Sequence, residues 1–354
     1  MLSVGDPDFA TPESVIDKAA QAMREGDTHY TSISGHEALR ECIAEKHHNS
    51  SGQVVAAANV ITTSGAQNAL FACSMCLAEK GDEIIVLQPM YVTYEATVKA
   101  SGATLVPVVL DAESGFRLDL DKLKAAVNER TRAIFYASPS NPTGISLNFN
   151  ELAGIAEIAR QHDLWVVADE VYSNFVFEGE FHHIATQPGM AERAITIGSM
   201  SKSYAMPGWR LGWIIAPTEM IANLEKLALC MLYGLPGFVQ QASLHALQHC
   251  EEDLQRMREV YRKRRDFLYD AIAGMKGLKP LLPEAGVFLM VNVIGTGLSA
   301  PEFVTALFER TGVSVLDGTA FGASAEGYVR VSYTIADDDL AEACCRIRTF
   351  VEGL

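Results

Sequence analysis

The middle of the chain alternates short, continuous apolar runs with helical segments, and this pattern constrains the fold more than any other feature. Runs such as 83–87 (EIIVL) and 164–168 (LWVVA) are apolar at nearly every position rather than at every second one. Strands of this kind are typical of a mostly parallel sheet that helices cover on both faces. The sequence therefore predicts an α/β fold with a doubly wound, mostly parallel sheet, in which ligands bind beyond the carboxyl ends of the strands. The expected strands cover 59–63, 83–87, 104–109, 133–136, 164–168, 194–197 and 211–216.

The C-terminal third has a different pattern. Residues 219–275 are helical and charged, with one long helix expected over 251–273. Two further strands, at 287–293 and 328–332, flank a helix at 301–311 and indicate a smaller α+β domain. We expect a large domain at 26–260 and a small domain that combines 1–25 with 261–354, joined through the long helix.

Charge and hydropathy exclude several classes of protein. Among 354 residues, 28 Lys and Arg face 44 Asp and Glu, so the net charge is −16. This balance argues against nucleic-acid binding, which needs clustered cations. No uncharged apolar run is long enough to span a bilayer, and the first ten residues lack the pattern of a signal peptide. We therefore expect neither a nucleic-acid partner nor a membrane partner.

Cysteine and histidine give no sign of a metal site. The seven cysteines are odd in number and scattered, which favours reduced thiols in the cytoplasm. Cys73 and Cys76 form a single CxxC in an apolar helical stretch, where packing is the expected role. The histidine pairs at 47–48 and 182–183 lack helical i,i+4 spacing and are expected on the surface or in loops. No metal is predicted.

Polar side chains follow successive predicted strands at the point where each strand ends. Asp169 and Tyr172 come after 164–168, Lys202 and Arg210 after 194–197, and Asn141 after 133–136. The segment 64–67 (SGAQ) joins a strand to a helix start, where free N–H groups and the helix dipole favour an anion. The glycine motifs of dinucleotide and P-loop sites are absent, which disfavours an oxidoreductase or a nucleotide-binding enzyme.

These residue types match the chemical needs of pyridoxal 5′-phosphate. A lysine forms a Schiff base with this cofactor, and a carboxylate pairs with its pyridine nitrogen. A phosphate group is bound well by a helix N-terminus together with an arginine.

The sequence resembles the fold-type-I pyridoxal-phosphate aminotransferases of class I/II over nearly its whole length. Six ordered blocks carry the resemblance: Val4–Phe9, Asn141–Gly144, Asp169–Tyr172, Ser199–Lys202, Gly208–Gly212 and Tyr328–Ser332. Members of this family usually carry an N-terminal arm before the first block, and the printed chain begins almost at that block.

The resemblance implies three catalytic residues. Lys202 would hold the cofactor through its amine and then act as general acid and base. Asp169 would keep the pyridine nitrogen protonated, while Tyr172 and Asn141 would form hydrogen bonds with the ring oxygen O3′.

The resemblance also implies how the rest of the cofactor is held. Gly65, Ala66, Ser199 and Arg210 would bind the phosphate, with Gln67 a weaker candidate. Tyr91 would stack on the ring, where many relatives have tryptophan, and a role for the nearby Tyr94 stays open.

The remaining roles concern the substrate and a second subunit. Arg330 would bind the substrate α-carboxylate, aided by the Gly5 backbone and Asn141. Tyr30 would reach the phosphate of a neighbouring subunit, which implies a homodimer with shared active sites.

The resemblance implies a transaminase that moves the α-amino group of an L-amino acid to a 2-oxo acid by a ping-pong mechanism. One aspartate-specific branch carries a lysine at the position of Ala66, so a dicarboxylic donor is disfavoured. Stretches at 2–9, 90–95 and 227–234 are most similar to arginine–pyruvate transaminases, which indicates a basic or neutral donor with pyruvate as acceptor. An aspartate or aromatic aminotransferase and a C–S lyase on the same fold stay open. A non-enzymatic regulator is disfavoured, because the chain has no basic DNA-binding segment.

Overall fold

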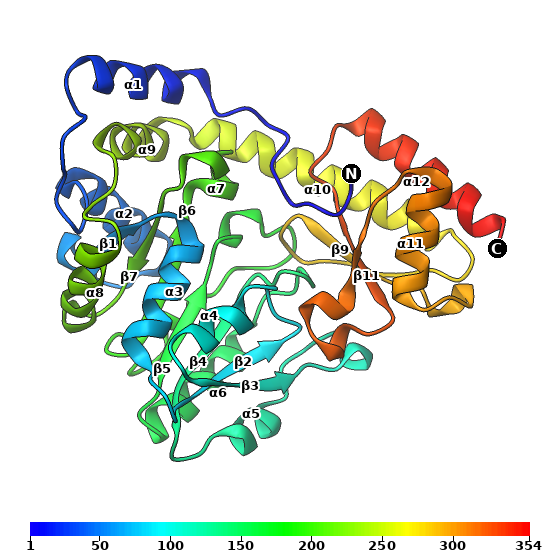
Figure 1. Cartoon of the computed structure of the whole chain (residues 1–354), viewed down its shortest axis with the longest axis horizontal. Helices are drawn as coiled ribbons and strands as arrows, with labels where there is room; N and C mark the ends of the chain where they lie inside the picture. The colour runs from blue at the N-terminus through cyan, green and yellow to red at the C-terminus, as the bar shows by residue number, and fades with distance from the viewer.

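A seven-stranded sheet forms the larger part of the molecule in the computed structural model, which describes residues 1–354 (Figure 1). The strand order is β1-β7-β6-β5-β4-β2-β3, and β7 alone runs antiparallel to its neighbours. The strands are β1 (Val60–Thr63), β2 (Glu83–Gln88), β3 (Thr104–Val109), β4 (Thr131–Ala137), β5 (Trp165–Asp169), β6 (Ala194–Ser199) and β7 (Gly212–Ile215). The predicted α/β class with a mostly parallel sheet is confirmed.

Helices cover both faces of this sheet, which explains the continuous apolar runs. Successive residues of β5 alternate between the two apolar layers: Val166 and Ala168 pack with the layer under α5 and α6, and Val167 with the layer under α3, α4 and α8. The helices of the two faces are α5 (Leu120–Ala126) and α6 (Phe149–Gln161), and α3 (Gly65–Leu77), α4 (Tyr94–Ala100) and α8 (Thr218–Met231).

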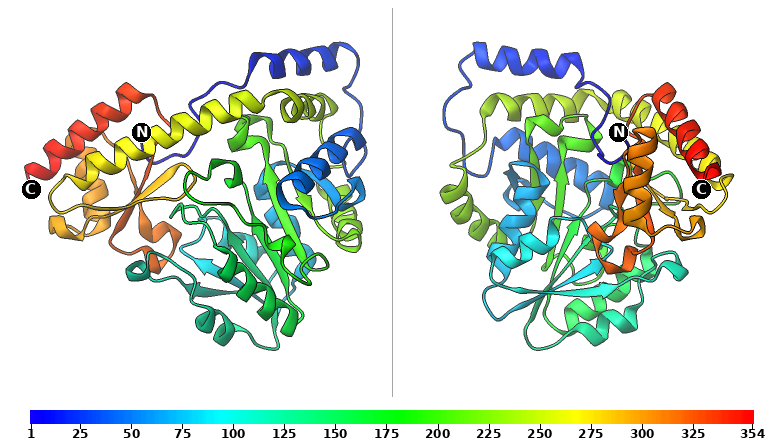
Figure 2. Two further views of the ribbon diagram at one scale, coloured as in Figure 1. Left: turned by 180° about the vertical axis from the view of Figure 1, so that it is seen from behind. Right: turned by 45° about the vertical axis from the view of Figure 1, so that its right-hand side comes forward.

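A smaller antiparallel sheet lies beside the large one, in the order β10-β11-β9-β8. Its strands are β8 (Lys279–Leu281), β9 (Phe288–Asn292), β10 (Leu316–Asp317) and β11 (Tyr328–Ser332), and it packs with α11 (Ala300–Thr311) and α12 (Asp337–Glu352). The long helix α10 (Glu251–Ala273) runs from the large sheet to the small one (Figure 2). The expected boundary at residue 260 falls inside this helix.

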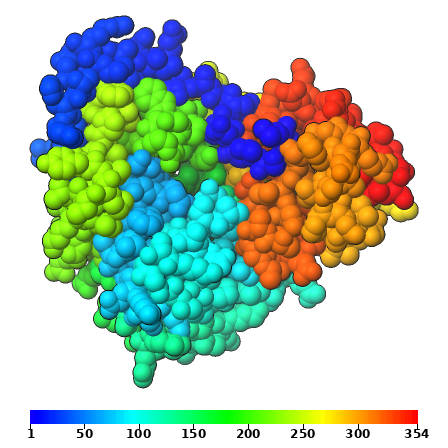
Figure 3. Space-filling view, in the orientation of Figure 1, coloured from blue at the N-terminus to red at the C-terminus, as the bar shows by residue number.

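The first residues of the chain join the small sheet rather than the large one. The Leu2 amide donates to Ser314 O at 2.8 Å, and the Ser332 amide donates to Leu2 O at the same distance. Figure 3 displays this segment, in dark blue, against the C-terminal part of the chain. Helix α1 (Glu13–Arg24), by contrast, packs on α9 (Gly237–His249) beside the large sheet. The division into domains at 1–25, 26–260 and 261–354 stays a prediction.

Most helix and strand positions agree with the expected ones, and α10 has the predicted bounds. The sequence does not predict β8 and β10, which are only three and two residues long. Cys73 is buried in α3 and all seven cysteines are free thiols. None of the helices has the length and apolar character that crossing a membrane requires.

Candidate active site

A cavity of about 430 Å³ lies between the two sheets, at the carboxyl ends of β4, β5 and β6. It brings together all the predicted site residues except Gly65 and Tyr30. The charged groups that line it are Asp6, Asp169, Lys202, Arg210 and Arg330. Parallel strands end at the same edge of a sheet, so residues far apart in the chain meet here.

Asp169 is the last residue of β5 and is buried. Its Oδ2 accepts a hydrogen bond of 3.0 Å from the Tyr94 hydroxyl, and its Oδ1 accepts one of 3.3 Å from the Val171 amide. Burial raises the pKa of Asp169 to about 6, although both hydrogen bonds oppose the shift. A cationic partner in the cavity would relieve this burial cost, because a buried carboxylate is stable only when paired.

Tyr94, whose role the sequence leaves open, contacts Asp169 directly. Its ring is buried in α4, and its hydroxyl points at Asp169. Tyr91 lines the cavity three residues earlier, with its ring edge-on to Tyr94 at 6.2 Å between centroids. Tyr91 and Tyr94 are three positions apart in the sequence, and this spacing indicates that their rings lie on the same side of the start of α4.

Lys202 sits in the short helix α7 (Met200–Ser203), directly after β6. Its Nζ donates a hydrogen bond of 2.6 Å to Gly5 O, so the first residues of the chain hold the amine. Burial lowers the pKa of Lys202, the charge of Asp6 raises it, and the charges of Arg330 and Arg210 lower it further. A neutral amine is the nucleophilic and basic form, and the net shift favours it.

Arg210 faces the start of α3, which has no side-chain cap. It adopts a left-handed φ of 56°, an uncommon conformation for a side chain of this size. Its Nη1 donates to Pro207 O at 2.8 Å and its Nη2 to Ser64 O at 3.4 Å. Gly65, with φ of 76°, leaves room for the guanidinium, because a Cβ there would lie 2.6 Å from Nη2. A guanidinium beside uncapped N–H groups is an anion site.

Ser199 and Gln67 flank this anion site in different ways. The Ser199 hydroxyl is buried, accepts from the Ser201 amide at 3.1 Å and caps α7. The side-chain amide of Gln67 is occupied by two threonines: it donates to Thr97 of α4 at 3.0 Å and accepts from Thr93, which directly precedes α4, at 2.5 Å. Gln67 can therefore offer its backbone N–H to an anion more readily than its side chain.

Arg330 projects from β11 into the cavity and is buried. Its Nη1 donates to Asn141 Oδ1 and its Nη2 to Ser3 O, both at 2.8 Å, while its Nε has no partner. The guanidinium carbon lies 3.8 Å from the centre of the Phe288 ring. Burial lowers the pKa of Arg330 to about 10, so the group stays charged at neutral pH. An oriented, desolvated guanidinium of this kind binds a carboxylate well.

Two predicted tyrosines differ in their relation to the cavity. Tyr172 lines it, is buried, and packs edge-on to Phe288 at 6.0 Å. Burial raises the pKa of its hydroxyl, so Tyr172 is a neutral hydrogen-bond donor at physiological pH. Tyr30 lies outside the cavity: it is 85% exposed and its ring packs on Tyr233 at 4.9 Å. Its expected role toward a second subunit stays a prediction.

The residues present fit pyridoxal 5′-phosphate. The cradle beside Gly65 suits a phosphate, the burial of Asp169 calls for a cation, and Lys202 offers an amine of lowered pKa. The unpaired Nε of Arg330 leaves a donor free for an incoming carboxylate. Three different demands of one cofactor and its substrate are thus met within one cavity.

His47 and His183, both expected on the surface or in loops, are buried: the expectation is wrong for His47, which lies in a helix, while His183 does lie in a loop. His47 lies in α2 (Glu37–Ser51), and its Nε2 is 2.7 Å from Gln53 Oε1. His183 Nδ1 lies 2.7 Å from Glu170 Oε2 in the interior. Gln53 lies just beyond the end of the helix that holds His47, whereas Glu170 is thirteen positions before His183.

Comparison with known proteins gives one consistent result. The sequence model of the family described as aminotransferase class I and II matches residues 1–347. The arginine–pyruvate transaminase AruH of Pseudomonas aeruginosa is 48% identical over 347 residues, covering 98% of this chain and 88% of that protein. An aspartate aminotransferase of Pyrococcus horikoshii is 35% identical over 356 residues, which cover 99% of this chain and 90% of that protein. The crystal structure of an aromatic aminotransferase from the same organism has a TM-score of 0.96 at 34% identity, covering 99% and 95%.

Proposed function

The chain belongs to the class I and II aminotransferases, a pyridoxal 5′-phosphate-dependent family, and we propose that it moves the α-amino group of arginine, or of another basic or neutral L-amino acid, to pyruvate. The transaminase activity follows from the family. The choice of donor rests on the 48% identity to an arginine–pyruvate transaminase and on the charge of the cavity.

One observation carries the proposed donor class. Asp6 and Asp169 are the two carboxylates that line the cavity, and Asp6 is exposed, with its charge acting on the Lys202 amine. In the proposed arrangement Asp169 pairs with the cofactor ring, Arg210 with the phosphate and Arg330 with the substrate carboxylate. Asp6 is then left to face a cationic side chain of the donor.

When bound, pyridoxal 5′-phosphate joins the substrate amine covalently and withdraws electrons from Cα, which makes the Cα proton acidic. In our proposal Lys202 removes that proton and later returns it, because its lowered pKa makes the free amine available. Asp169 accepts a hydrogen bond from the ring nitrogen and favours its protonated state. Tyr172 and Asn141 donate hydrogen bonds to the ring oxygen O3′.

Substrate orientation is assigned to Arg330. Two of its three nitrogen atoms are fixed by Asn141 and Ser3, so the guanidinium is held in place before the substrate arrives. Preorganisation of this kind lowers the entropy lost on binding. The same clamp serves the amino acid and the 2-oxo acid, which share the α-carboxylate.

We further propose a homodimer and a cytoplasmic location. The exposed aromatic pair of Tyr30 and Tyr233, with the exposed Leu229 and Leu232 nearby in sequence to Tyr233, supports an apolar interface. Seven unpaired cysteines support a reducing compartment. Light scattering at several protein concentrations tests the dimer, and a Tyr30→Ala/Tyr233→Ala variant should weaken it.

The decisive experiment mixes the holoenzyme with one amino acid at a time and follows the absorbance of the bound cofactor. We expect arginine to convert the cofactor fastest, and added pyruvate to restore the starting spectrum with formation of alanine. Faster conversion by aspartate or aromatic amino acids would overturn the proposed donor. Release of pyruvate and ammonia from a sulfur amino acid, without an acceptor, would favour the C–S lyase alternative.

A further inference from the structure

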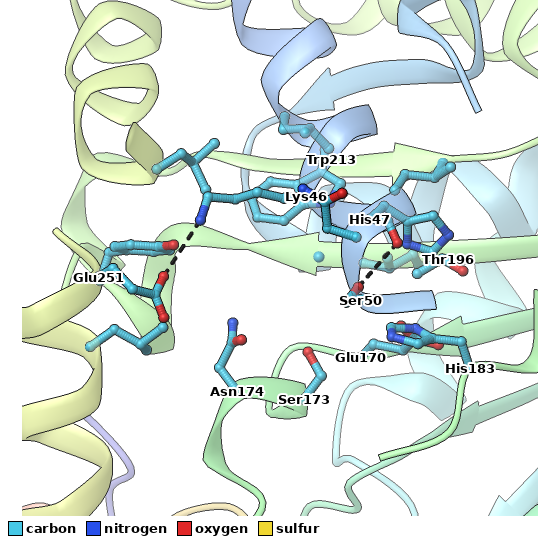
Figure 4. A pocket seen from close by; sticks show the side chains of 18 residues that line it. Lys46, His47, Ser50, Glu170, Ser173, Asn174, His183, Thr196, Trp213 and Glu251 are labelled. Atoms are coloured by element: carbon cyan, nitrogen blue, oxygen red, sulfur yellow. Dashed lines mark hydrogen bonds and ion pairs between the residues drawn. The ribbon is translucent and has the colours of Figure 1, made fainter. Parts of the chain in front are cut away.

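A second cavity, of about 380 Å³, lies next to the end of β5 (Figure 4). The end of α2, the loop after β5 and the start of α10 line it. Consecutive strand residues point to opposite faces of a sheet. Asp169 accordingly lines the first cavity and Glu170 lines the second. Asp169, the residue proposed to contact the cofactor ring, is thus followed in the chain by a second carboxylate, Glu170, which faces the second cavity.

Glu170 and His183 form a buried pair, called here the Glu170–His183 pair. The 2.7 Å contact joins Glu170 Oε2 to His183 Nδ1, and the two residues are 6% and 8% exposed. The Glu170 backbone amide donates to Ile197 O at 3.0 Å, which fixes the backbone of Glu170 relative to β6. The His183 ring is held edge-on by Phe181 at 4.7 Å. A buried carboxylate stays ionised only with such a partner.

We infer that His183 is a positioning residue for the cofactor: its protonated imidazole balances the charge of Glu170, and this keeps the adjacent Asp169 ionised to receive the ring nitrogen. The inference rests on the proposed role of Asp169. It assigns a function to a histidine that touches neither cofactor nor substrate.

The electrostatics are consistent with this role. The negative charge of Glu170 raises the pKa of Asp169, after the larger effect of burial. Burial alone would lower the pKa of His183, but the charge of Glu170 and the hydrogen bond to it raise the pKa above the usual 6.5. The net shift favours the charged form of the His183 imidazole.

The other groups that face the pair do not supply this charge. His47 lies edge-on to His183 at 5.3 Å, and burial lowers its pKa, which favours the neutral ring. Tyr136 is buried and its raised pKa keeps it neutral. Across the cavity, Lys46 and Glu251 lie 3.5 Å apart and offset each other. His183 is thus the one basic side chain within ion-pair distance of the Glu170 carboxylate.

The test measures the affinity of the apoenzyme for pyridoxal 5′-phosphate from pH 5 to pH 8, by fluorescence quenching. The variants are His183→Gln, Glu170→Gln, the double variant and Asp169→Asn, with His182→Gln as the matched control. Each variant's affinity is divided by that of the wild type at the same pH. Ionisation of the free cofactor affects the wild type and every variant equally, so its effect on the measured affinity cancels in this ratio.

We expect His183→Gln to leave Glu170 unbalanced and to lose about threefold more affinity at pH 5.5 than at pH 8, equal to a shift of about half a pH unit in Asp169. The double variant removes both charges and should recover the pH dependence of the wild type. Glu170→Gln, which removes the negative charge, should likewise show no extra loss of cofactor affinity at pH 5.5. His182→Gln should behave as wild type.

An equal loss at every pH in His183→Gln, or a double variant worse than the single one, would mean a purely structural role and overturn the inference. If the affinity ratio of Asp169→Asn shows a loss at pH 8 that shrinks at pH 5.5, while the ratios of the pair variants stay at one at every pH, the inference fails and the role of Asp169 stands. If Asp169→Asn binds the cofactor with unchanged affinity at every pH, the proposed role of Asp169 fails, and the inference fails with it.

Discussion

The hydroxyl of Tyr94 donates a 3.0 Å hydrogen bond to Oδ2 of Asp169, inside the protein and next to the proposed place of the cofactor ring. This bond stabilises the ionised carboxylate and lowers its pKa, against the effect of burial. Tyr94→Phe should therefore raise the pKa of Asp169 by about one unit, the equivalent of one hydrogen bond to a charged group. The acid limb of kcat/KM should move to higher pH by the same amount. An unchanged pH profile would show that Tyr94 has no part in the ionisation of Asp169.

Asp169→Asn should stabilise the apoenzyme at neutral pH. A carboxyl group whose folded pKa is about 6, against an ordinary 3.8, destabilises the fold above pH 6 and has no such effect below pH 3.8. Asparagine keeps an acceptor for Tyr94 and removes the charge. We expect a gain of roughly 2–3 kcal/mol in the free energy of unfolding at pH 8, and almost none at pH 4. Urea denaturation of the wild-type and variant apoproteins at pH 4 and pH 8 measures this gain. An equal gain at the two pH values would contradict a raised pKa of Asp169.

Lys202→Ala should remove the covalent attachment of the cofactor and lower turnover by at least about a hundredfold, the usual contribution of a positioned acid–base group. Borohydride treatment followed by mass spectrometry should find the cofactor mass on the wild type and not on the variant. The matched control is Lys99→Ala, since Lys99 is exposed and pairs with Glu95 at 2.5 Å. Cofactor mass on the variant protein would place the Schiff base on another lysine.

Arg330→Lys should raise KM for every amino donor by about thirtyfold and change kcat much less, because a fork of fixed donors is replaced by one flexible ammonium. Steady-state kinetics with arginine and alanine test this. Arg310→Lys provides the control, since Arg310 of α11 packs on Phe350 of α12 and does not line the cavity. A change in kcat alone would argue against a carboxylate-binding role.

Asp6→Asn should lower kcat/KM for arginine about fivefold and leave that for alanine nearly unchanged, the size expected for a partly solvated ion pair. The comparison of two donors in one variant separates side-chain recognition from damage to the site. Equal losses with both donors would remove Asp6 from the specificity argument and leave the transaminase activity untouched.

The sequence predicts the large sheet well because its strands are buried on both faces, so that local composition alone reveals them. It predicts Lys202, Asp169 and Arg330 as candidates because each lies in a recognisable block beside a strand. It fails for His183, whose partner Glu170 is thirteen positions away and meets it only after folding. It also leaves Tyr94 open, because the start of α4 decides which tyrosine turns inward. Short edge strands such as β8 carry too few residues for any pattern.

The bond from Arg330 to Ser3 joins residues 327 positions apart, and Lys202 is likewise held by Gly5. During synthesis the first residues leave the ribosome before the strand that will receive them exists. A ribosome-bound chain that lacks β11 therefore has no carboxylate clamp, whatever the state of the large sheet. If Arg330 binds the substrate as proposed, the substrate site is complete only when translation is nearly finished, and a product truncated before β11 should be inactive.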